Sequence, residues 1–165
     1  MKLKAWQLLA LLIAAAVVLV GGFYLVVDYQ RNKPAAPVAE LRVVVSSGGN
    51  ELEVAPYTVC ELDAQCAGGE PPTITLDPGS EVTVTVPRDV AASSWRLLSI
   101  YDDPAVNDEQ IFQSGQATQA SVPAVKDSAR LVVAEVSALA VDTNDAGEEV
   151  PVIATWSVAF SGEDS

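Results

Sequence analysis

Residues 81–87 read EVTVTVP, and this pattern indicates the fold class of the larger part of the chain. Three valines alternate with two threonines, which is the two-residue period of a half-buried β-strand. Residues 73–76 (TITL) repeat the alternation upstream, and the intervening residues 77–80 (DPGS) have the composition of a tight turn. We therefore predict a β-hairpin over residues 73–87.

Similar strand and turn patterns extend in both directions, over residues 40–161. Short runs rich in Val, Ile, Thr and aromatic residues are separated by Gly, Pro, Asn and Asp. No helical period occurs here, and residues 107–114 could hold one helical turn at most. About eight strands in roughly 125 residues predict a mainly β fold, an immunoglobulin-like antiparallel β-sandwich. The other predicted strands, of which the first two form a hairpin and the fifth is central, are residues 41–46, 52–54, 95–101, 117–122, 131–141 and 150–160.

An apolar segment precedes this region, because residues 5–27 read AWQLLALLIAAAVVLVGGFYLVV without a single charge. Residues 8–27 alone would cover about 30 Å as a helix, the thickness of the hydrocarbon core of a bilayer. We predict one N-terminal transmembrane α-helix, a signal-anchor over residues 5–27, which makes the lipid bilayer a direct partner. The alternative is a cleaved secretory signal with its best cleavage site at residues 20–22, but the length of the apolar run favours the anchor.

The residues that flank the apolar run give the predicted orientation. Lys2, Lys4 and the amino terminus precede it, while Arg31 and Lys33 follow, so the amine favours a cytoplasmic start. We expect a single-pass protein of the plasma membrane with its C-terminal domain outside the cytoplasm. The predicted parts are a cytoplasmic head at 1–4, the anchor at 5–27, a tether at 28–39, the extracytoplasmic sandwich at 40–161 and a tail at 162–165.

The charge and the missing histidines exclude several classes of function. The 165 residues include 9 Lys and Arg, 22 Asp and Glu and no His, for a formal charge of -13. Such a chain repels polyanions, so we predict no nucleic-acid partner. Without imidazole there is no Ser-His-Asp triad, no Cys-His nucleophile and no His-ligated metal site. We therefore expect a protein that is not an enzyme and that has no cofactor, metal site or catalytic residue.

Two pairs of residues are candidate sites. Cys60 and Cys66 are expected to form a disulfide outside the cytoplasm, where closing so short a loop would stabilise the fold by roughly 2–3 kcal/mol. A redox-active pair is disfavoured, because such motifs use a two-residue spacing and the acidic neighbours here raise the thiol pKa. Gly21 and Gly22 form a small patch where a partner helix could pack within the membrane, although they lack the four-residue spacing of the known motif.

Other groupings have simpler interpretations. Residues 142–149 (DTNDAGEE) begin like a calcium loop, but Ile153 stands where a bidentate Glu belongs, so a hairpin turn is favoured. The carboxylates at 102–103 and 108–109 could gather around a hard cation or form a general acid/base pair, but a solvated loop is the favoured interpretation. Five aromatic residues could line a ligand groove, and core packing is the favoured interpretation; they are Trp95, Tyr101, Phe112, Trp156 and Phe160.

The order of several features resembles a known family. After the anchor and a Pro-containing tether come residues 56–60 (PYTVC) with Cys66 six positions on, then residues 74–79 (ITLDPG) and Trp95. From residue 41 onward this resembles a family of small uncharacterised actinobacterial envelope proteins. The resemblance implies a mycolate-type envelope and a domain on the outer side of the plasma membrane. In size and topology the chain is also similar to accessory subunits of the actinobacterial cytochrome bc1-aa3 respiratory supercomplex.

Two functions follow as predictions. The first is a non-catalytic accessory or interaction subunit of a larger integral membrane complex, with a respiratory complex as one such partner. The alternative is an envelope binding module that holds a hydrophobic or lipid ligand between its sheets. A cavity inside the sandwich would favour the ligand, whereas a flat exposed apolar patch near the membrane would favour the subunit.

Overall fold

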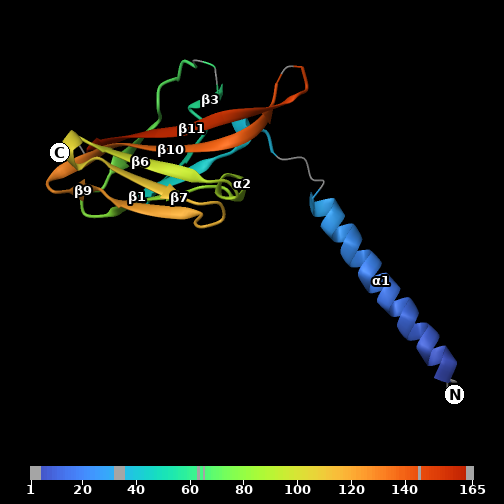
Figure 1. The fold of residues 1–165 in the computed structure, drawn as a ribbon. Helices are drawn as coiled ribbons and strands as arrows, with labels where there is room; N and C mark the ends of the chain where they lie inside the picture. The colour runs from blue at the N-terminus through green and yellow to red at the C-terminus, as the bar shows by residue number, and fades with distance from the viewer. Residues whose placement is uncertain (1–4, 32–35, 63, 65, 145, 163–165) are drawn as a thin grey trace. The chain divides into compact units, whose positions relative to one another are not determined.

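The computed structural model describes residues 5–31, 36–62, 64, 66–144 and 146–162, which fall into two compact units (Figure 1). The first unit is Met1–Ala35 and the second is Ala36–Ser165. The predicted head at residues 1–4 lies outside the described residues, as do residues 163–165 of the predicted tail. We call the second unit the sandwich domain.

The first unit contains one long helix, α1 (Ala5–Arg31). Its sequence is rich in Ala and Leu and free of proline, which favours a helix. The large apolar side chains of Ile13, Phe23 and Leu25, among others, are exposed along it. Among the residues that the structure describes, no helix is long and apolar enough to cross a membrane.

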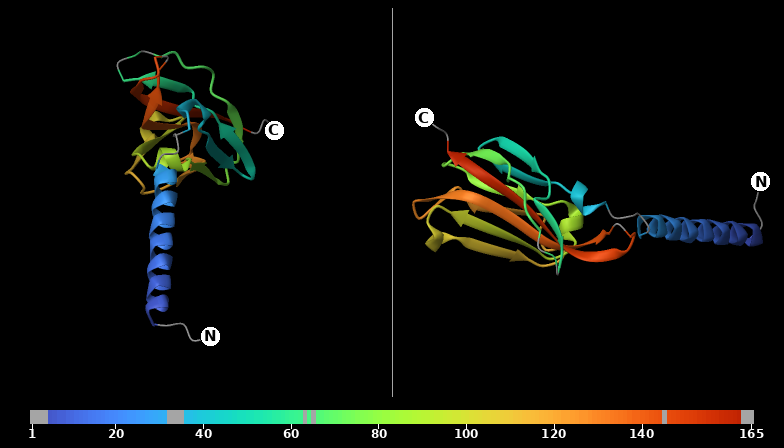
Figure 2. Two further views of the ribbon diagram at one scale, coloured as in Figure 1. Left: turned by 90° about the vertical axis from the view of Figure 1, so that its right-hand side faces the viewer. Right: turned by 90° about the horizontal axis from the view of Figure 1, so that it is seen from above.

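Two β-sheets pack face to face in the sandwich domain, as Figure 2 shows. The smaller sheet has the strand order β2-β1-β5-β8. The larger has the order β3-β11-β10-β6-β7, with β4 paired to β11 and β9 paired to β10. The strands are β1 (Val43–Ser47), β2 (Asn50–Val54), β3 (Thr58–Glu61), β4 (Thr73–Leu76), β5 (Glu81–Thr85), β6 (Trp95–Tyr101), β7 (Asp108–Phe112), β8 (Gln119–Pro123), β9 (Val125–Lys126), β10 (Ala129–Thr143) and β11 (Glu149–Gly162). Three short helical segments accompany them, η1 (Val38–Glu40), α2 (Arg88–Ala91) and η2 (Pro104–Val106).

The core lies between the sheets and includes two tryptophans whose indole groups are paired. Trp95 Nε1 donates to the Ala117 carbonyl oxygen at 2.9 Å, and Trp156 Nε1 donates to that of Leu41 at 3.2 Å. Trp95 also stacks on Phe112, with ring centroids 4.2 Å apart. Because a buried indole needs a partner for its N–H, these bonds let the largest side chains enter the core without a desolvation cost. Core packing of the five aromatic residues is confirmed, since Tyr101 is buried and Phe160 packs against the same cluster.

Tyr101 links the two sheets. Its hydroxyl donates to the Pro123 carbonyl oxygen at 2.9 Å, which ties β6 of the larger sheet to β8 of the smaller one. Burial, and to a smaller extent the negative charge of Asp108, raises the pKa of Tyr101 above its usual value of 10.0.

The predicted hairpin near the start of the domain is confirmed. Ser47 pairs with Asn50, so Gly48 and Gly49 alone form the turn between β1 and β2. Both have positive φ, 55° and 88°, as a type I′ turn requires. Gly48 also lies against Asp77, whose side chain would overlap a Cβ placed there.

The predicted hairpin over residues 73–87 is wrong. β4 pairs in parallel with β11, whereas β5 lies in the other sheet, antiparallel to β1 and β8. Residues 77–80 do reverse the chain, but they carry it from one sheet to the other. Turn chemistry specifies the reversal and not the pairing of the flanking strands. The sandwich is therefore antiparallel except at the β4–β11 pair.

The structure also has strands that the sequence did not indicate. β3, β7 and β9 are short and lack clear alternation, so no periodic signal marks them. Residues 107–114 were expected to hold at most a helical turn, yet β7 lies there and pairs with β6. The run at 131–141 was expected to be central, and β10 does lie between β11 and β6.

Candidate interaction surface

The outer face of the larger sheet carries an apolar patch. Strand alternation directs Val136 and Ala138 of β10 into the core, so the next residues on the opposite side face outward. The outward side chains that form the patch are Leu139 (54% exposed) and Val141 (61%) of β10, Ile153 (42%) of β11 and Ile111 (61%) of β7. We call these four residues the hairpin face.

The register of the strands brings these side chains together. Leu139 pairs directly with Ile153, and Val141 pairs with Pro151 on the same side of the sheet. β6 reaches only as far as Ala138, which pairs with Trp95. Beyond that point β10 and β11 continue as an arm that β6 does not flank, visible in Figure 1 as the orange and red hairpin. On the other side of this arm, β3 pairs with residues 152–155 of β11. Three of the exposed apolar residues, Leu139, Val141 and Ile153, therefore lie on this arm.

An open depression of about 290 Å³ lies between Ile111 and the arm. Arg96 borders it and is held by two side chains: its guanidinium donates to Ser137 Oγ at 3.1 Å and to Glu109 Oε1 at 3.0 Å. The charge of Arg96 is thus balanced within the domain. The lining residues are Ser94, Trp95, Arg96, Ile111, Ser137, Ala138, Leu139 and Ile153.

Glutamates surround the hairpin face. Glu135 lies on β10, four residues before Leu139 and on the same side of the strand. Glu149 lies on β11, four residues before Ile153, and Glu109 lies on β7 two residues before Ile111. The patch therefore has a carboxylate on each of its three strands, with Arg96 as a countercharge already bonded to one of them.

The interior of the sandwich is closely packed. The cavity between the sheets has a volume of about 10 Å³, which is about the space of one water molecule. It is lined by Val43, Val45, Val54, Val84, Ala134, Val136, Trp156, Ser157 and Val158. A cavity of that size does not admit an acyl chain or any other organic ligand.

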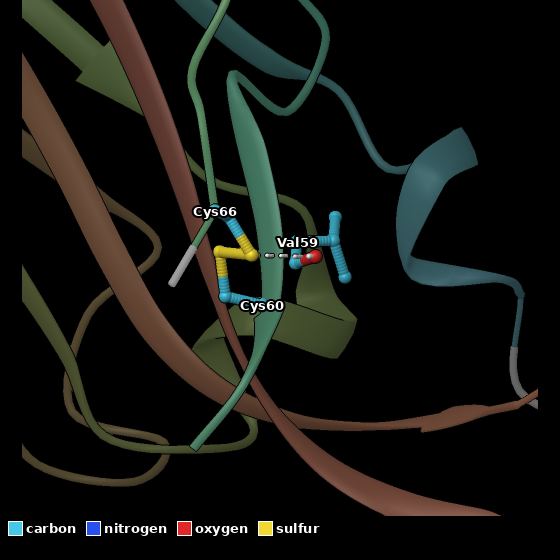
Figure 3. The surroundings of a disulfide bond; sticks show 3 residues. All are labelled: Val59, Cys60 and Cys66. Carbon is cyan, nitrogen blue, oxygen red and sulfur yellow. Dashed lines mark hydrogen bonds between the residues drawn. A yellow bond between two sulfur atoms is a disulfide. The ribbon is translucent and has the colours of Figure 1, made fainter. Parts of the chain in front are cut away.

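The predicted disulfide is confirmed (Figure 3). Cys60 on β3 and Cys66 in the following loop are bonded, with Cα atoms 5.9 Å apart. Cys66 Sγ lies 3.8 Å from the Val59 carbonyl oxygen. Cys60 also pairs with Ile153, so the bridge fixes the loop next to that residue.

The other predicted pair, Gly21 and Gly22, lies on α1 in the first unit. Nothing stands within 4 Å of a Cβ placed at either glycine, so both positions are open to a neighbour. Their role in helix packing stays a prediction.

The polar and acidic residues at 142–149 and 102–103 accept hydrogen bonds that organise nearby turns. The turn between β10 and β11 is organised by Asn144, whose Oδ1 accepts from the backbone N–H groups of Ala146 and Glu148, as the hairpin interpretation requires. Asp145 of that segment lies outside the described residues. Asp102 Oδ1 accepts from Arg130 N, and Asp103 caps η2. Within the described ranges, no group of three or more His, Cys, Asp or Glu could hold a metal ion.

The hairpin face itself was not anticipated. The sequence showed that residues 131–141 are apolar on both sides, which indicated a strand covered on both faces. A signal was nevertheless available, because Leu139 and Val141 are followed by a polar turn where a sheet usually ends.

Comparison with known proteins gives a family and distant relatives. The model of the family described as "Protein of unknown function (DUF2771)" matches residues 36–161. Uncharacterized proteins of Mycobacterium bovis and Mycobacterium tuberculosis are each 32% identical over 121 residues, covering 68% of this chain and 72% of the relative. No solved structure matches. These findings agree with the expected resemblance to uncharacterised actinobacterial proteins.

Proposed function

The chain belongs to the DUF2771 family, and from that premise we propose that it is a non-catalytic accessory subunit of a larger membrane complex. In this proposal residues 5–27 anchor it in the plasma membrane as a single pass, with the sandwich domain outside the cytoplasm. The domain then contacts an integral membrane partner. The resemblance in size and topology favours the actinobacterial respiratory supercomplex as that partner.

The observation that carries the proposal is the hairpin face. Four large apolar side chains are exposed together on a domain with a strongly acidic composition. Isolated exposed apolar residues are ordinary, whereas a contiguous group within a polar border is typical of a contact surface. The closely packed interior argues against the alternative of a ligand held between the sheets.

The support for an anchor comes from the sequence and from the exposed side chains of α1, and not from a detected membrane span. Residues 5–27 contain no charge, and Trp6, Tyr24 and Tyr29 lie near the ends of the segment, where aromatic residues favour the bilayer interfaces. The apolar side chains between Ile13 and Val26 are exposed to a degree that would be costly in water.

Fractionation of the native host tests the anchor. The full chain should stay in the membrane pellet after a carbonate wash, and protease added to spheroplasts should digest the sandwich domain. A Val17→Arg/Val20→Arg variant should lose retention, because each central Arg costs about 2.5–3.5 kcal/mol on insertion scales. A Val17→Leu/Val20→Leu variant is the matched control. A shortened chain that begins after residue 22 in the medium would mean that the segment is a cleaved signal.

Copurification tests the role as a subunit. After gentle solubilisation, the chain should migrate with a larger membrane complex whose components are identified by mass spectrometry. Migration as a lone 17.3 kDa species under several gentle detergents would contradict the proposal.

A further inference from the structure

We propose that the hairpin face docks onto a protein surface that is apolar at its centre and carries Lys or Arg at its border. This inference rests on the proposed function only for the identification of the partner as part of a membrane complex. The four apolar side chains of the hairpin face match an apolar centre on the partner, and the glutamates around them match a basic border on the partner.

The apolar side chains are concentrated on this face. In the described part of the sandwich domain, the exposed large hydrophobic residues are Leu62, Ile111, Val125, Val132, Leu139, Val141 and Ile153. Four of these seven form the hairpin face, and Leu62 belongs to the disulfide loop beside it. The clustering is what distinguishes a contact surface from scattered exposure.

The charges around the hairpin face determine which charge the partner surface should carry. Glu109, Glu135 and Glu149 share the outer side of the sheet with the hairpin face. Arg96 is bonded to Glu109, and Lys126 lies near Asp108, so both cations are balanced by carboxylates of the domain. A partner that brings Lys or Arg to the border would therefore be attracted, and an acidic one would be repelled.

The same charges disfavour two other occupants. A second copy of the chain placed face to face would bring glutamates against glutamates. A bilayer surface with anionic headgroups would also repel this border. In addition, the four residues of the face are aliphatic, whereas Trp, Tyr, Lys and Arg are the residues that stabilise contact with headgroups.

Site-specific photocrosslinking tests the occupant. A photoreactive benzoylphenylalanine replaces Leu139 in the full chain, which is expressed and irradiated in the native host. The expected result is an adduct with another protein, in which the crosslinked peptide combines apolar residues with Lys or Arg. The matched control carries the same probe at Val132, which is also exposed on β10 but lies outside the face, and it should give little of this adduct.

Every other outcome overturns the proposal. An adduct with lipid would identify the membrane as the occupant, and an adduct with a second copy would identify a homodimer. An acidic crosslinked peptide, equal yields from positions 139 and 132, or no adduct at either position would each refute docking of a basic partner at this face.

Charge reversal at the border provides a second readout. The pair Glu135→Lys and Glu149→Lys should lower the yield of the Leu139-position adduct roughly three- to tenfold, since each exposed ionic contact is worth about 0.2–1 kcal/mol. The control pair Glu51→Lys and Glu53→Lys changes the net charge equally on β2 of the other sheet. Equal loss in both pairs would show that only the overall charge matters, which contradicts a border specific to this face.

The fractions used for crosslinking separate this proposal from the proposed function. If the chain is absent from the membrane pellet but still forms the adduct, then the anchor is wrong and the docking surface holds. If the chain is retained in the membrane but forms no adduct, then the docking surface is wrong and the anchor holds.

Discussion

Replacing Ser99 by alanine should stabilise the sandwich, although it removes a polar group from the core. Ser99 lies on β6, faces inward and is 1% exposed, and its Oγ has no hydrogen-bond partner among the described residues. A buried hydroxyl without a partner costs about 1–3 kcal/mol. Removing one oxygen atom leaves a void whose cost is a few tenths of a kcal/mol, at about 24 cal/mol per Å³. We expect a net gain of about 1 kcal/mol, or roughly 3–5 °C in Tm.

The matched control is Ser47→Ala. Ser47 is equally buried at 1%, but its Oγ accepts a hydrogen bond from Asp77 N at 3.1 Å. Its removal leaves that N–H without its partner, so we expect a loss of about 1–2 kcal/mol. The two substitutions delete the same atom at the same burial and should therefore act with opposite signs.

Urea unfolding of the full chain in detergent micelles measures both effects. Near-UV circular dichroism reports on the sandwich, because Trp95 and Trp156 are buried in its core. The midpoint should rise for Ser99→Ala and fall for Ser47→Ala, with the slope of the transition unchanged. If Ser99→Ala destabilises as much as Ser47→Ala, then the Ser99 hydroxyl is satisfied in solution and the reasoning fails.

Three further predictions concern the turn, the link between the sheets and the disulfide. Gly48→Ala should lower the free energy of unfolding by about 2 kcal/mol or more, because residue 48 has a positive φ and the new Cβ would overlap the Asp77 side chain. Gly49→Ala should cost less, because its Cβ would meet open space. Equal losses in urea titrations would contradict the role of the overlap. Tyr101→Phe should cost about 1 kcal/mol at neutral pH. Burial raises the pKa of Tyr101 in the folded state, so the tyrosine contributes stability below pH 10 that is lost as pH rises through the folded pKa. The Tm should therefore fall more steeply above pH 10 for the wild type than for the variant. Replacing Cys60 and Cys66 together by serine should cost about 2 kcal/mol on the loop-entropy estimate and match the reduced wild type, and titration of the denatured, unreduced protein should find no free thiol.

The strands with clear alternation could be predicted from the sequence, but their partners could not. Residues 95–101 match β6 at both ends, and the burial of alternate side chains follows the expected faces. The segment at 73–76 was also recognised as a strand, yet it pairs with residues 159–162 of β11, which lie 86 positions further along the chain. The sequence around residues 73–76 does not indicate this pairing, because alternation shows which side of a strand is buried and not which strand lies beside it.

The disulfide and the hairpin face illustrate the same limit at the level of the site. The pairing of Cys60 with Cys66 was predictable, since the chain has two cysteines at a short spacing. The exposure of Leu139 was not, because a strand that is apolar on both sides has the same sequence whether its outer face is covered by the fold or left for a partner. The register with Ile153, which brings the exposed side chains together, is a property of the folded sheet alone.

The position of β11 has a consequence for how the domain is made. β11 follows its partners β3, β4 and β10 in the chain, and it lies between them in the larger sheet. None of these three pairings can form until β11 has been synthesised, so the larger sheet cannot close on a nascent chain that lacks residues 149–162. The pairings of β11 with β3 and β4 also join residues far apart in the sequence, and such pairings form slowly. If the domain is exported through the membrane, then this topology delays folding until nearly the whole domain has crossed. Until then the chain stays unfolded and can pass through the translocation machinery.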